Sequence, residues 1–374
     1  MTIGILHEPA FESRVSLLPE HVAQLKKQNI TVLVEKESGL KAFASDDQYL
    51  KVDAAVGVRE DVLHNSDIIL CIHPLSAEEM PKIKRDAVLI GMFNPLSQTA
   101  LINGWIAGNT NVFSLDMLPR TTRAQSMDVL SSQANIAGYR AVLMAALHLP
   151  KYFPMFMTAA GSVTPAKILI LGAGVAGLQA IATARRLGGV VEVFDTRPSV
   201  KEEVMSLGAK FIEVEGAADA SAAGGYAVEQ TEEYRMKQQQ RIAEVAVKAD
   251  VIITTAQIPG RKAPVLITEA ILENMKPGAL IIDLAASTGG NTTRTKNNET
   301  VIFNNVSIIG DSNLAAGMPA DASKLYGKNV LNFLQLMITK EGQLNLNFDD
   351  DLVKGACITH EGEIMNERVK QSIT

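Results

Sequence analysis

The sequence predicts an α/β protein with two domains, each built on a parallel sheet, that are linked by long helices. Short apolar runs alternate with helical segments along most of the chain, which is typical of strands joined by crossover helices. One run ends in a glycine-rich turn, and the 374 residues exceed the length of one ordinary domain. Together these observations favour two Rossmann-like domains, one of which carries a glycine fingerprint.

The clearest signal lies in residues 167–197, which read as a strand, a glycine turn, a helix and a second strand. Residues 168–171 are continuously apolar, as expected of a parallel strand buried on both faces. The turn consists of Gly172, Ala173, Gly174, Val175, Ala176 and Gly177. Its first glycine permits a tight turn, its second lets the backbone approach a pyrophosphate, and its third lets the helix pack close to the sheet. We therefore expect a dinucleotide whose pyrophosphate lies on the helix N-terminus.

Asp195 ends the second strand, about 20 residues beyond the glycines, where a carboxylate can accept hydrogen bonds from both hydroxyls of an adenosine ribose. A carboxylate there repels a 2′-phosphate, so NAD is favoured over NADP. Thr196 and Arg197 follow and are assigned to the same cofactor site, and the charge of Arg197 keeps NADP open as an alternative. A glycine turn that serves only chain reversal is the plainer interpretation.

The composition is that of a globular protein, with 47% hydrophobic and 20% charged residues. A formal net charge of -6 argues against a surface for nucleic acid or anionic membranes. Cys71 and Cys357 lie far apart, which suits a reducing compartment, and the histidines show no metal-ligand spacing. No apolar run approaches the roughly 18 residues that span a bilayer. We expect a soluble, cytoplasmic chain that binds no metal and no nucleic acid and does not insert into the membrane.

Apolar runs predict further strands in both halves of the chain. They occupy residues 2–6, 31–35, 67–72, 87–93 and 111–118 in the first half, and residues 190–194, 210–215, 251–256, 280–284 and 306–309 in the second. A helix over residues 319–338 is long enough to return the chain to the first domain, on which residues 357–360 would pack as a strand. The expected domains are therefore residues 1–135 with 318–374, and residues 136–317.

One long helix is expected over residues 122–149, because apolar residues recur there at helical spacing. Asp128, Ser131 with Ser132, and Asn135 form a polar stripe of the same period. Such a stripe is either solvated or lines a site.

Plainer interpretations exist for the polar residues at the start of this helix. Gln125 fits a capping box with Thr122, and Asp128 fits a first-turn acid that complements the helix dipole. Arg120 and Arg123 fit surface charges.

Two segments of the second half have no strand or helix pattern. Residues 161–165 read as a linker into the glycine fingerprint, and the small residues at 216–230 read as a mobile loop. Tyr226 is the loop residue most able to cover a ligand, although the loop could equally be disordered or contact another subunit.

Residues 120–139, RTTRAQSMDVLSSQANIAGY, resemble the NAD(H)-binding subunit, domain I, of the proton-translocating NAD(P) transhydrogenases. The likeness continues through LGAGVAGLQAIATARRLG, GGYAVE, TTAQIPGRKAPVLIT, MKPGALIIDLAASTGGN and DDLVKGACITHEGEI, so it covers nearly the whole chain. The 20-residue block is far more specific than the glycine triplet. Gln257, which is assigned to the cofactor site, and Lys262 stand where an apolar residue and a proline are expected.

The resemblance implies a homodimeric, two-domain subunit that holds NAD(H) in a cleft between its two domains, beside the glycine turn. By matching positions, Arg120, Asp128 and Ser131 would orient the dihydronicotinamide, and Gln125 would reach towards the nucleotide of a partner. Tyr226 matches the tyrosine of the mobile loop in that family.

The resemblance also implies partner subunits. NADP(H) would be bound by one of them, and a separate membrane-spanning subunit would translocate the proton, so this chain would attach peripherally to the inner face of the cell membrane. Hydride transfer between two nicotinamides needs positioning, not a general acid or base.

Two alternatives stay open. Alanine dehydrogenases look similar in both domains, but their chemistry requires a lysine and a histidine in the cleft. At the corresponding places this chain has the segment from Cys71 to His73 and Asn94, although Arg14 matches a substrate-binding arginine of that family. A non-catalytic, NAD-responsive binding module is the second alternative, since a fold alone does not establish a function.

Overall fold

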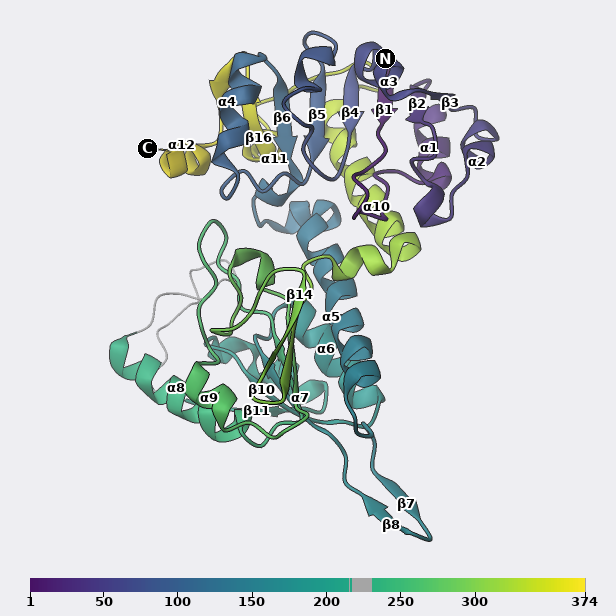
Figure 1. Ribbon diagram of the computed structural model, residues 1–374. Coiled ribbons are helices and arrows are strands. Elements are labelled where there is room, and N and C mark those ends of the chain that lie inside the picture. Colours follow the sequence, from purple (N-terminus) through teal and green to yellow (C-terminus); the bar gives the residue numbers. More distant parts are fainter. Residues whose placement is uncertain (215, 217–230, 374) are drawn as a thin grey trace. The chain divides into compact units, whose positions relative to one another are not determined.

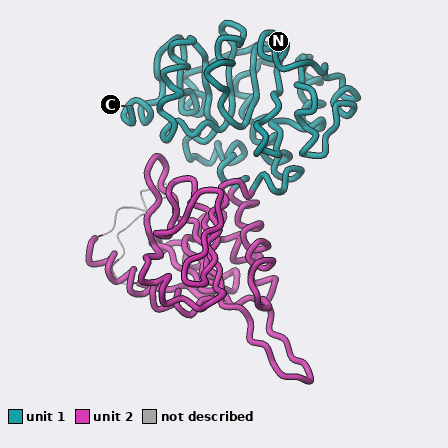
Figure 2. The backbone as a smooth tube through the Cα atoms, viewed as in Figure 1, with its two compact units in different colours: residues 1–133, 315–374 teal, residues 134–314 magenta. Residues whose placement is uncertain are grey.

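The computed structural model describes residues 1–214, 216 and 231–373, which form two compact units (Figures 1 and 2). Unit 1 comprises residues 1–133 and 315–374, and unit 2 comprises residues 134–314. The chain leaves unit 1 inside helix α5 (Val129–His148) and returns just before α10 (Pro319–Met337). Tyr226, with nearly all of the loop expected around it, lies outside the described residues.

Unit 1 is built on an eight-stranded sheet with the order β17-β16-β6-β5-β4-β1-β2-β3. Its strands are β1 (Thr2–Ile5), β2 (Thr31–Glu35), β3 (Ala55–Gly57), β4 (Ile68–Leu70), β5 (Val88–Gly91), β6 (Asn111–Ser114), β16 (Cys357–His360) and β17 (Glu363–Ile364). Besides α10, its helices are α1 (Pro19–Lys26), α2 (Asp46–Leu50), α3 (Arg59–Asn65), α4 (Thr99–Ala107), α11 (Asp351–Ala356) and α12 (Glu367–Ile373). Strands β1 to β6 are parallel, whereas β16 adds antiparallel to β6. The C-terminal segment therefore completes the sheet of unit 1.

Unit 2 is built on a seven-stranded sheet with the order β11-β10-β9-β12-β13-β15-β14, which is parallel except for the pair β14–β15. Its strands are β9 (Lys167–Leu171), β10 (Val190–Phe194), β11 (Lys210–Phe211), β12 (Val251–Thr254), β13 (Leu280–Asp283), β14 (Glu299–Phe303) and β15 (Val306–Gly310). Its helices, with part of α5, are α6 (Val175–Arg186), α7 (Lys201–Ser206), α8 (Glu232–Ala246) and α9 (Glu269–Glu273). β9, α6 and β10 confirm the strand, turn, helix and strand predicted for residues 167–197. The strand order reverses beside β9.

Side chains of the central strands of unit 2 are buried on both faces of the sheet. Ile168 and Ile170 pack in one apolar cluster with residues of α5 and α6, and Leu169 and Leu171 pack in another with residues of α8 and α9. This alternation is what a parallel sheet between two helix layers requires, and it explains the unbroken apolar runs in the sequence. No helix in the described part of the chain is long and apolar enough to cross a membrane.

The single helix expected over residues 122–149 is wrong. Thr122–Met127 form the 3-10 helix η4, and α5 starts only at Val129. Asp128 stands between them in an extended conformation, with φ -74° and ψ 90°, and its carboxylate accepts hydrogen bonds from the backbone N–H and the hydroxyl of Ser131. An aspartate that caps a helix in this way interrupts the preceding turn, so Asp128 splits the predicted helix. The plainer interpretation of Thr122 and Gln125 as a capping box is also wrong, because the cap of η4 is Thr121, without a side-chain hydrogen bond.

A two-stranded hairpin, β7 (Phe156–Thr158) and β8 (Gly161–Val163), occupies much of the segment before the fingerprint. The linker expected at residues 161–165 is therefore wrong over the residues of β8. The hairpin projects from the rest of unit 2 (Figure 1), and its side chains are largely exposed.

Charged residues are buried in the loop between β1 and α1. The Glu8 carboxylate accepts backbone hydrogen bonds from Ile72 at 2.6 Å and His73 at 3.1 Å. Burial raises the pKa of Glu8 to about 7. Burial would also raise the pKa of Glu12, but hydrogen bonds from Arg14 and His73 outweigh it and lower that pKa to about 2. One loop thus holds two buried carboxyls whose pKa values shift in opposite directions, upward for Glu8 and downward for Glu12.

We predict that Glu8→Gln changes the pH dependence of stability. The unfolded carboxyl loses its proton near 4.5, whereas the folded one keeps it to about 7. The stability that Glu8 contributes below pH 4.5 is therefore lost as the pH rises through 7, and the uncharged glutamine avoids this loss. Between about pH 5 and about pH 8, the free energy of unfolding should shift in favour of the variant by roughly 3 kcal/mol. Urea denaturation at both pH values measures it.

Glu20→Gln, at an exposed position of α1, is the control and should follow the wild type at both pH values. A difference between Glu8→Gln and the wild type that is the same at both pH values would contradict a raised pKa.

Candidate functional site

The three glycines of the turn between β9 and α6 differ in what surrounds them. Gly172 has φ +104°, and a Cβ there would lie 2.3 Å from Oγ1 of Thr255. A Cβ at Gly177 would lie 1.9 Å from the carbonyl oxygen of Gly172. At Gly174, in contrast, a Cβ would meet no atom of the described part of the chain within 4 Å. The protein's own packing therefore requires the first and third glycines, whereas the second leaves open space at the helix start.

That open space lies at the N-terminus of α6, for which Gly174 is the N-cap. The first backbone N–H groups of an α-helix have no partner within the helix and carry partial positive charge. Val175 and Ala176 supply such groups, and Gly138 of α5 packs so closely that its Cβ would lie 2.1 Å from the carbonyl oxygen of Ala176. The residues present thus fit a phosphate or pyrophosphate: an open approach, helix N–H donors and a helix held in place from behind.

Asp195 lies directly after β10 and is 9% exposed. Its Oδ2 accepts the backbone N–H of Ala173 at 2.7 Å, and its Oδ1 accepts the backbone N–H of Arg197 at 2.8 Å. The Arg197 side chain donates to both oxygens, from Nε at 2.9 Å and from Nη2 at 2.7 Å. These hydrogen bonds raise the pKa of Arg197. Thr196 lies between the two and is partly buried.

Sequence reasoning missed the residues that support the turn from the neighbouring strands. Thr255 follows β12, and its hydroxyl lies 3.2 Å from the carbonyl oxygens of Leu171 and Gly172. Asn291 is fully buried and ties Ala256 to the chain beyond β13, accepting from its N–H and donating to its carbonyl oxygen. Gln257, which follows Ala256 in the sequence, is exposed and donates to the carbonyl oxygen of Leu284 at 2.8 Å. The signal for Thr255 was its place after a strand that neighbours the fingerprint strand.

The four residues predicted to act at the nicotinamide lie in unit 1, around η4 and the start of α5. Arg120 and Gln125 are exposed, and Asp128 and Ser131 are partly buried and bonded to each other, with 2.6 Å between the Ser131 hydroxyl and Oδ2 of Asp128. The structure thus joins Asp128 and Ser131 directly. Of the further stripe residues, Asn135 donates to Gln179 of α6 within unit 2.

Three anchors fix η4 to the rest of unit 1. Ala124 and Met127 are buried, and the carbonyl oxygen of Ser126 accepts hydrogen bonds from Asn329 and Asn332 of α10. Arg123 forms ion pairs with Asp350 and Asp351. Arg123 therefore serves as an anchor at the surface of unit 1.

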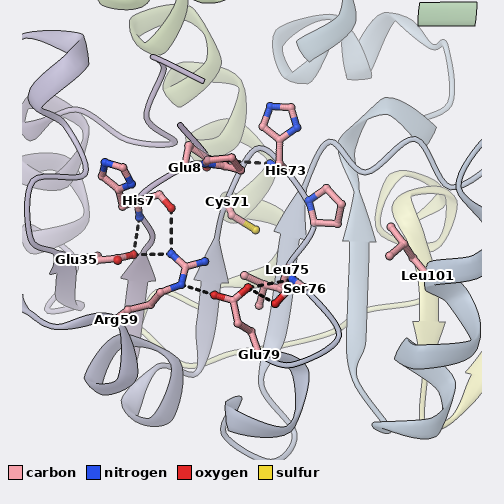
Figure 3. A pocket seen from close by; sticks show the side chains of 12 residues that line it. His7, Glu8, Glu35, Arg59, Cys71, His73, Leu75, Ser76, Glu79 and Leu101 are labelled. Atoms are coloured by element: carbon pink, nitrogen blue, oxygen red, sulfur yellow. Dashed lines mark hydrogen bonds and ion pairs between the residues drawn. The ribbon is translucent and has the colours of Figure 1, made fainter. Parts of the chain in front are cut away.

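Unit 1 also has a pocket of about 540 Å³ at the carboxyl ends of its parallel strands (Figure 3). Arg59 lies in its wall between Glu35 and Glu79 and forms ion pairs with both. The same guanidinium donates to the carbonyl oxygen of His7 at 3.0 Å. One guanidinium is thus shared between two carboxylates of the wall. The described residues contain no group of three side chains that could hold a metal ion.

Comparison with known families gives matches over most of the chain. Residues 4–137 match the family described as "Alanine dehydrogenase/PNT, N-terminal domain", and residues 141–367 match "Alanine dehydrogenase/PNT, C-terminal domain". Two relatives, from Rickettsia prowazekii and Rhodospirillum rubrum, are each named as the first of the separate parts of an NAD(P) transhydrogenase subunit alpha. The first is 41% identical over 96% of this chain and 94% of its own length, and the second is 43% identical over 95% of both.

Solved structures agree. The crystal structure of the transhydrogenase from Sinorhizobium meliloti has a TM-score of 0.86 at 40% identity and covers 98% of this chain and 99% of that one. An L-alanine dehydrogenase has a TM-score of 0.84 at 21% identity over 100% and 99% of the two chains, which shows a shared fold. The chain belongs to the NAD(P) transhydrogenase alpha subunits of the alanine dehydrogenase/PNT family of oxidoreductases.

Proposed function

We propose that this chain is the NAD(H)-binding subunit of a proton-translocating NAD(P) transhydrogenase. It transfers a hydride from NADH to NADP+ on a partner subunit, and a separate membrane subunit translocates the proton and holds this chain at the inner face of the cell membrane. Gly174 is the observation that carries the nucleotide site, because no atom of the described residues packs where its Cβ would lie and so accounts for that glycine. A pyrophosphate that must approach the backbone there does account for it.

In this proposal each residue has a binding role. Residues 172–177 hold the pyrophosphate, Asp195 accepts the adenosine ribose hydroxyls, and Thr196, Arg197 and Gln257 line the same site. Arg120, Asp128 and Ser131 orient the dihydronicotinamide, Gln125 reaches the nucleotide of the partner, and Tyr226 covers the bound cofactor.

When bound, NADH supplies a hydride, and no proton moves at the reacting carbons. The chain therefore needs groups that orient, and the Asp128–Ser131 pair is such a group because each side chain restricts the other. η4 is likewise held at the Ser126 carbonyl by two asparagine side chains. Rigid support of this kind keeps a reacting pair close to its productive geometry.

We predict that Gly174→Ala weakens NADH binding without unfolding the protein. A Cβ at this position meets no atom of the described residues within 4 Å, and φ -78° suits alanine, so stability should change by about 1 kcal/mol or less. The methyl group would occupy the path of the pyrophosphate, and the NADH dissociation constant should rise at least about tenfold. Calorimetric titration with NADH and thermal melting measure the two effects.

Gly177→Ala is the matched comparison and should lower the melting temperature, because its Cβ meets the Gly172 carbonyl. Wild-type NADH affinity in Gly174→Ala would contradict a pyrophosphate at this turn.

We predict hydride transfer only in the presence of an NADP-binding partner. The purified chain is mixed with the NADP-binding domain of a transhydrogenase, and NADH-driven reduction of NADP+, or of a nicotinamide analogue, is followed by absorbance. Arg120→Ala and Asp128→Asn should each lower the rate by at least about tenfold through lost positioning. Asparagine also caps helices well, so Asp128→Asn should preserve α5.

Arg123→Ala is the control for Arg120→Ala, because Arg123 binds two aspartates at the surface and is assigned no ligand. Full activity of both Arg120→Ala and Asp128→Asn would refute their assigned roles.

The same assay separates the alternatives. Turnover with pyruvate and ammonia alone would establish an alanine dehydrogenase, and NADH binding without any turnover, beside a competent partner, would establish a regulatory module. Arg14 argues against the first, because its three guanidinium nitrogens already donate to Glu12 and Gln133 inside unit 1.

The hairpin β7–β8 supports a homodimer as part of this proposal. Met155 and Met157 are 64% and 75% exposed, and Tyr152 and Phe156 stack on each other in an exposed pair. A two-stranded hairpin is marginal by itself, and clustered apolar side chains mark a contact surface. We assign a second copy of this chain as the molecule that covers it.

We predict that Met157→Asp converts the dimer to a monomer, because a carboxylate would be buried in an apolar contact. Sedimentation equilibrium measures the mass. Met236→Asp, at a 64% exposed position on α8, should remain dimeric, and a dimeric Met157→Asp would exclude the hairpin from the interface.

A further inference from the structure

The Asp195 carboxylate has no acceptor position left for a ribose. Two oxygens offer about four acceptor positions in total. The backbone N–H groups of Ala173 and Arg197 take one on each oxygen, and Nε and Nη2 of Arg197 take the other two. The side chains of the ion pair are 17% and 6% exposed, so water competes little for these positions.

Only two of these four donors can leave. The N–H of Ala173 belongs to the glycine turn, and the N–H of Arg197 lies two residues from Asp195 in the loop after β10, so the backbone fixes both. The guanidinium, at the end of a flexible side chain, donates the remaining two hydrogen bonds from Nε and Nη2. A ribose also offers two hydroxyl donors, and the two groups therefore compete for the same pair of acceptor positions.

We propose that Arg197 is an internal competitor of the adenosine ribose, and that it thereby sets nucleotide affinity and the choice between NADH and NADPH. This inference rests on the proposed nucleotide site. To bind NADH, Asp195 must release the guanidinium, which lowers the affinity for NADH.

NADPH meets a different situation at the same carboxylate. Its 2′-phosphate is repelled by a bare Asp195, but a guanidinium that stays beside the carboxylate can also bind the phosphate. Arg197 thus lowers the affinity for NADH and raises the affinity for NADPH. The preference for NADH over NADPH is therefore smaller than Asp195 alone would give.

The test is Arg197→Ala, with dissociation constants for NADH and NADPH from calorimetric titration of the full chain. NADH should bind about 3- to 10-fold more tightly and NADPH about 3- to 10-fold more weakly, as for loss of one partly buried charge pair. Reduced nicotinamide mononucleotide, which lacks the adenosine, should bind equally to both proteins. Arg197→Lys keeps the charge but loses the bidentate hydrogen bonding of the guanidinium. NADH should therefore bind more tightly, while NADPH keeps part of its affinity.

A purely structural role for Arg197 would shift the affinities for both nucleotides in one direction, and that result would overturn the proposal, as would weaker NADH binding by Arg197→Ala. Arg186→Ala removes the same charge from the exposed C-terminal end of α6, the end opposite the glycine turn, and should change neither constant. If wild type binds neither nucleotide, both this inference and the proposed function fail; if it binds NADH and Arg197→Ala binds it equally, only this inference fails.

Discussion

The close approach of α6 to β9 is the constraint on which the proposed nucleotide site depends. No side chain fits at Gly177, because the Gly172 carbonyl lies where its Cβ would be. The helix can therefore begin immediately after the strand, and its N-terminal N–H groups lie at the carboxyl end of the sheet. At Gly172 any other residue would be strained, since φ is positive there and Thr255 fills the space beside it. Asp195 then accepts the N–H of Ala173 and links the turn to the next strand.

Unit 1 is built on the same kind of parallel sheet, but the loop after its strand β1 is longer and differs in what it buries. After β1 the chain runs from Leu6 to Leu18 before α1 begins, so no helix N-terminus follows the strand directly. That longer loop buries Glu8, Glu12 and Arg14 instead. A buried carboxylate is tolerated only when it is paired or protonated, and the loop contains one of each kind. An architecture shared by both units thus yields the proposed pyrophosphate site in one and a network of internal charges in the other.

The sequence predicted the features that depend on burial. Strands such as β9 and β12 read as apolar runs because both faces of the sheet are covered, and the glycine turn read clearly because its spacing is set by backbone contacts. Peripheral strands were missed, since β3 and β14 contain no buried residue and their apolar runs are only two or three residues long. The prediction of one helix over residues 122–149 failed because the helical spacing of apolar residues continues across Asp128, where the backbone is extended and the helix is interrupted. The pairing of Arg197 with Asp195 depends on side-chain geometry, which residue spacing does not encode.

Asp128 and Asp195 show why a structural role and the proposed binding role need not exclude each other. Capping of α5 uses two hydrogen bonds from Ser131, one on each oxygen of Asp128. A carboxylate with about four acceptor positions then keeps capacity for a ligand, so the cap can orient the group that binds. Asp195 holds the turn with one backbone bond on each oxygen as well, but Arg197 takes the rest. The two aspartates therefore have similar structural roles and differ in the number of acceptor positions that are left. Asp128 can accept a ligand hydrogen bond without losing a partner, whereas Asp195 must first release one.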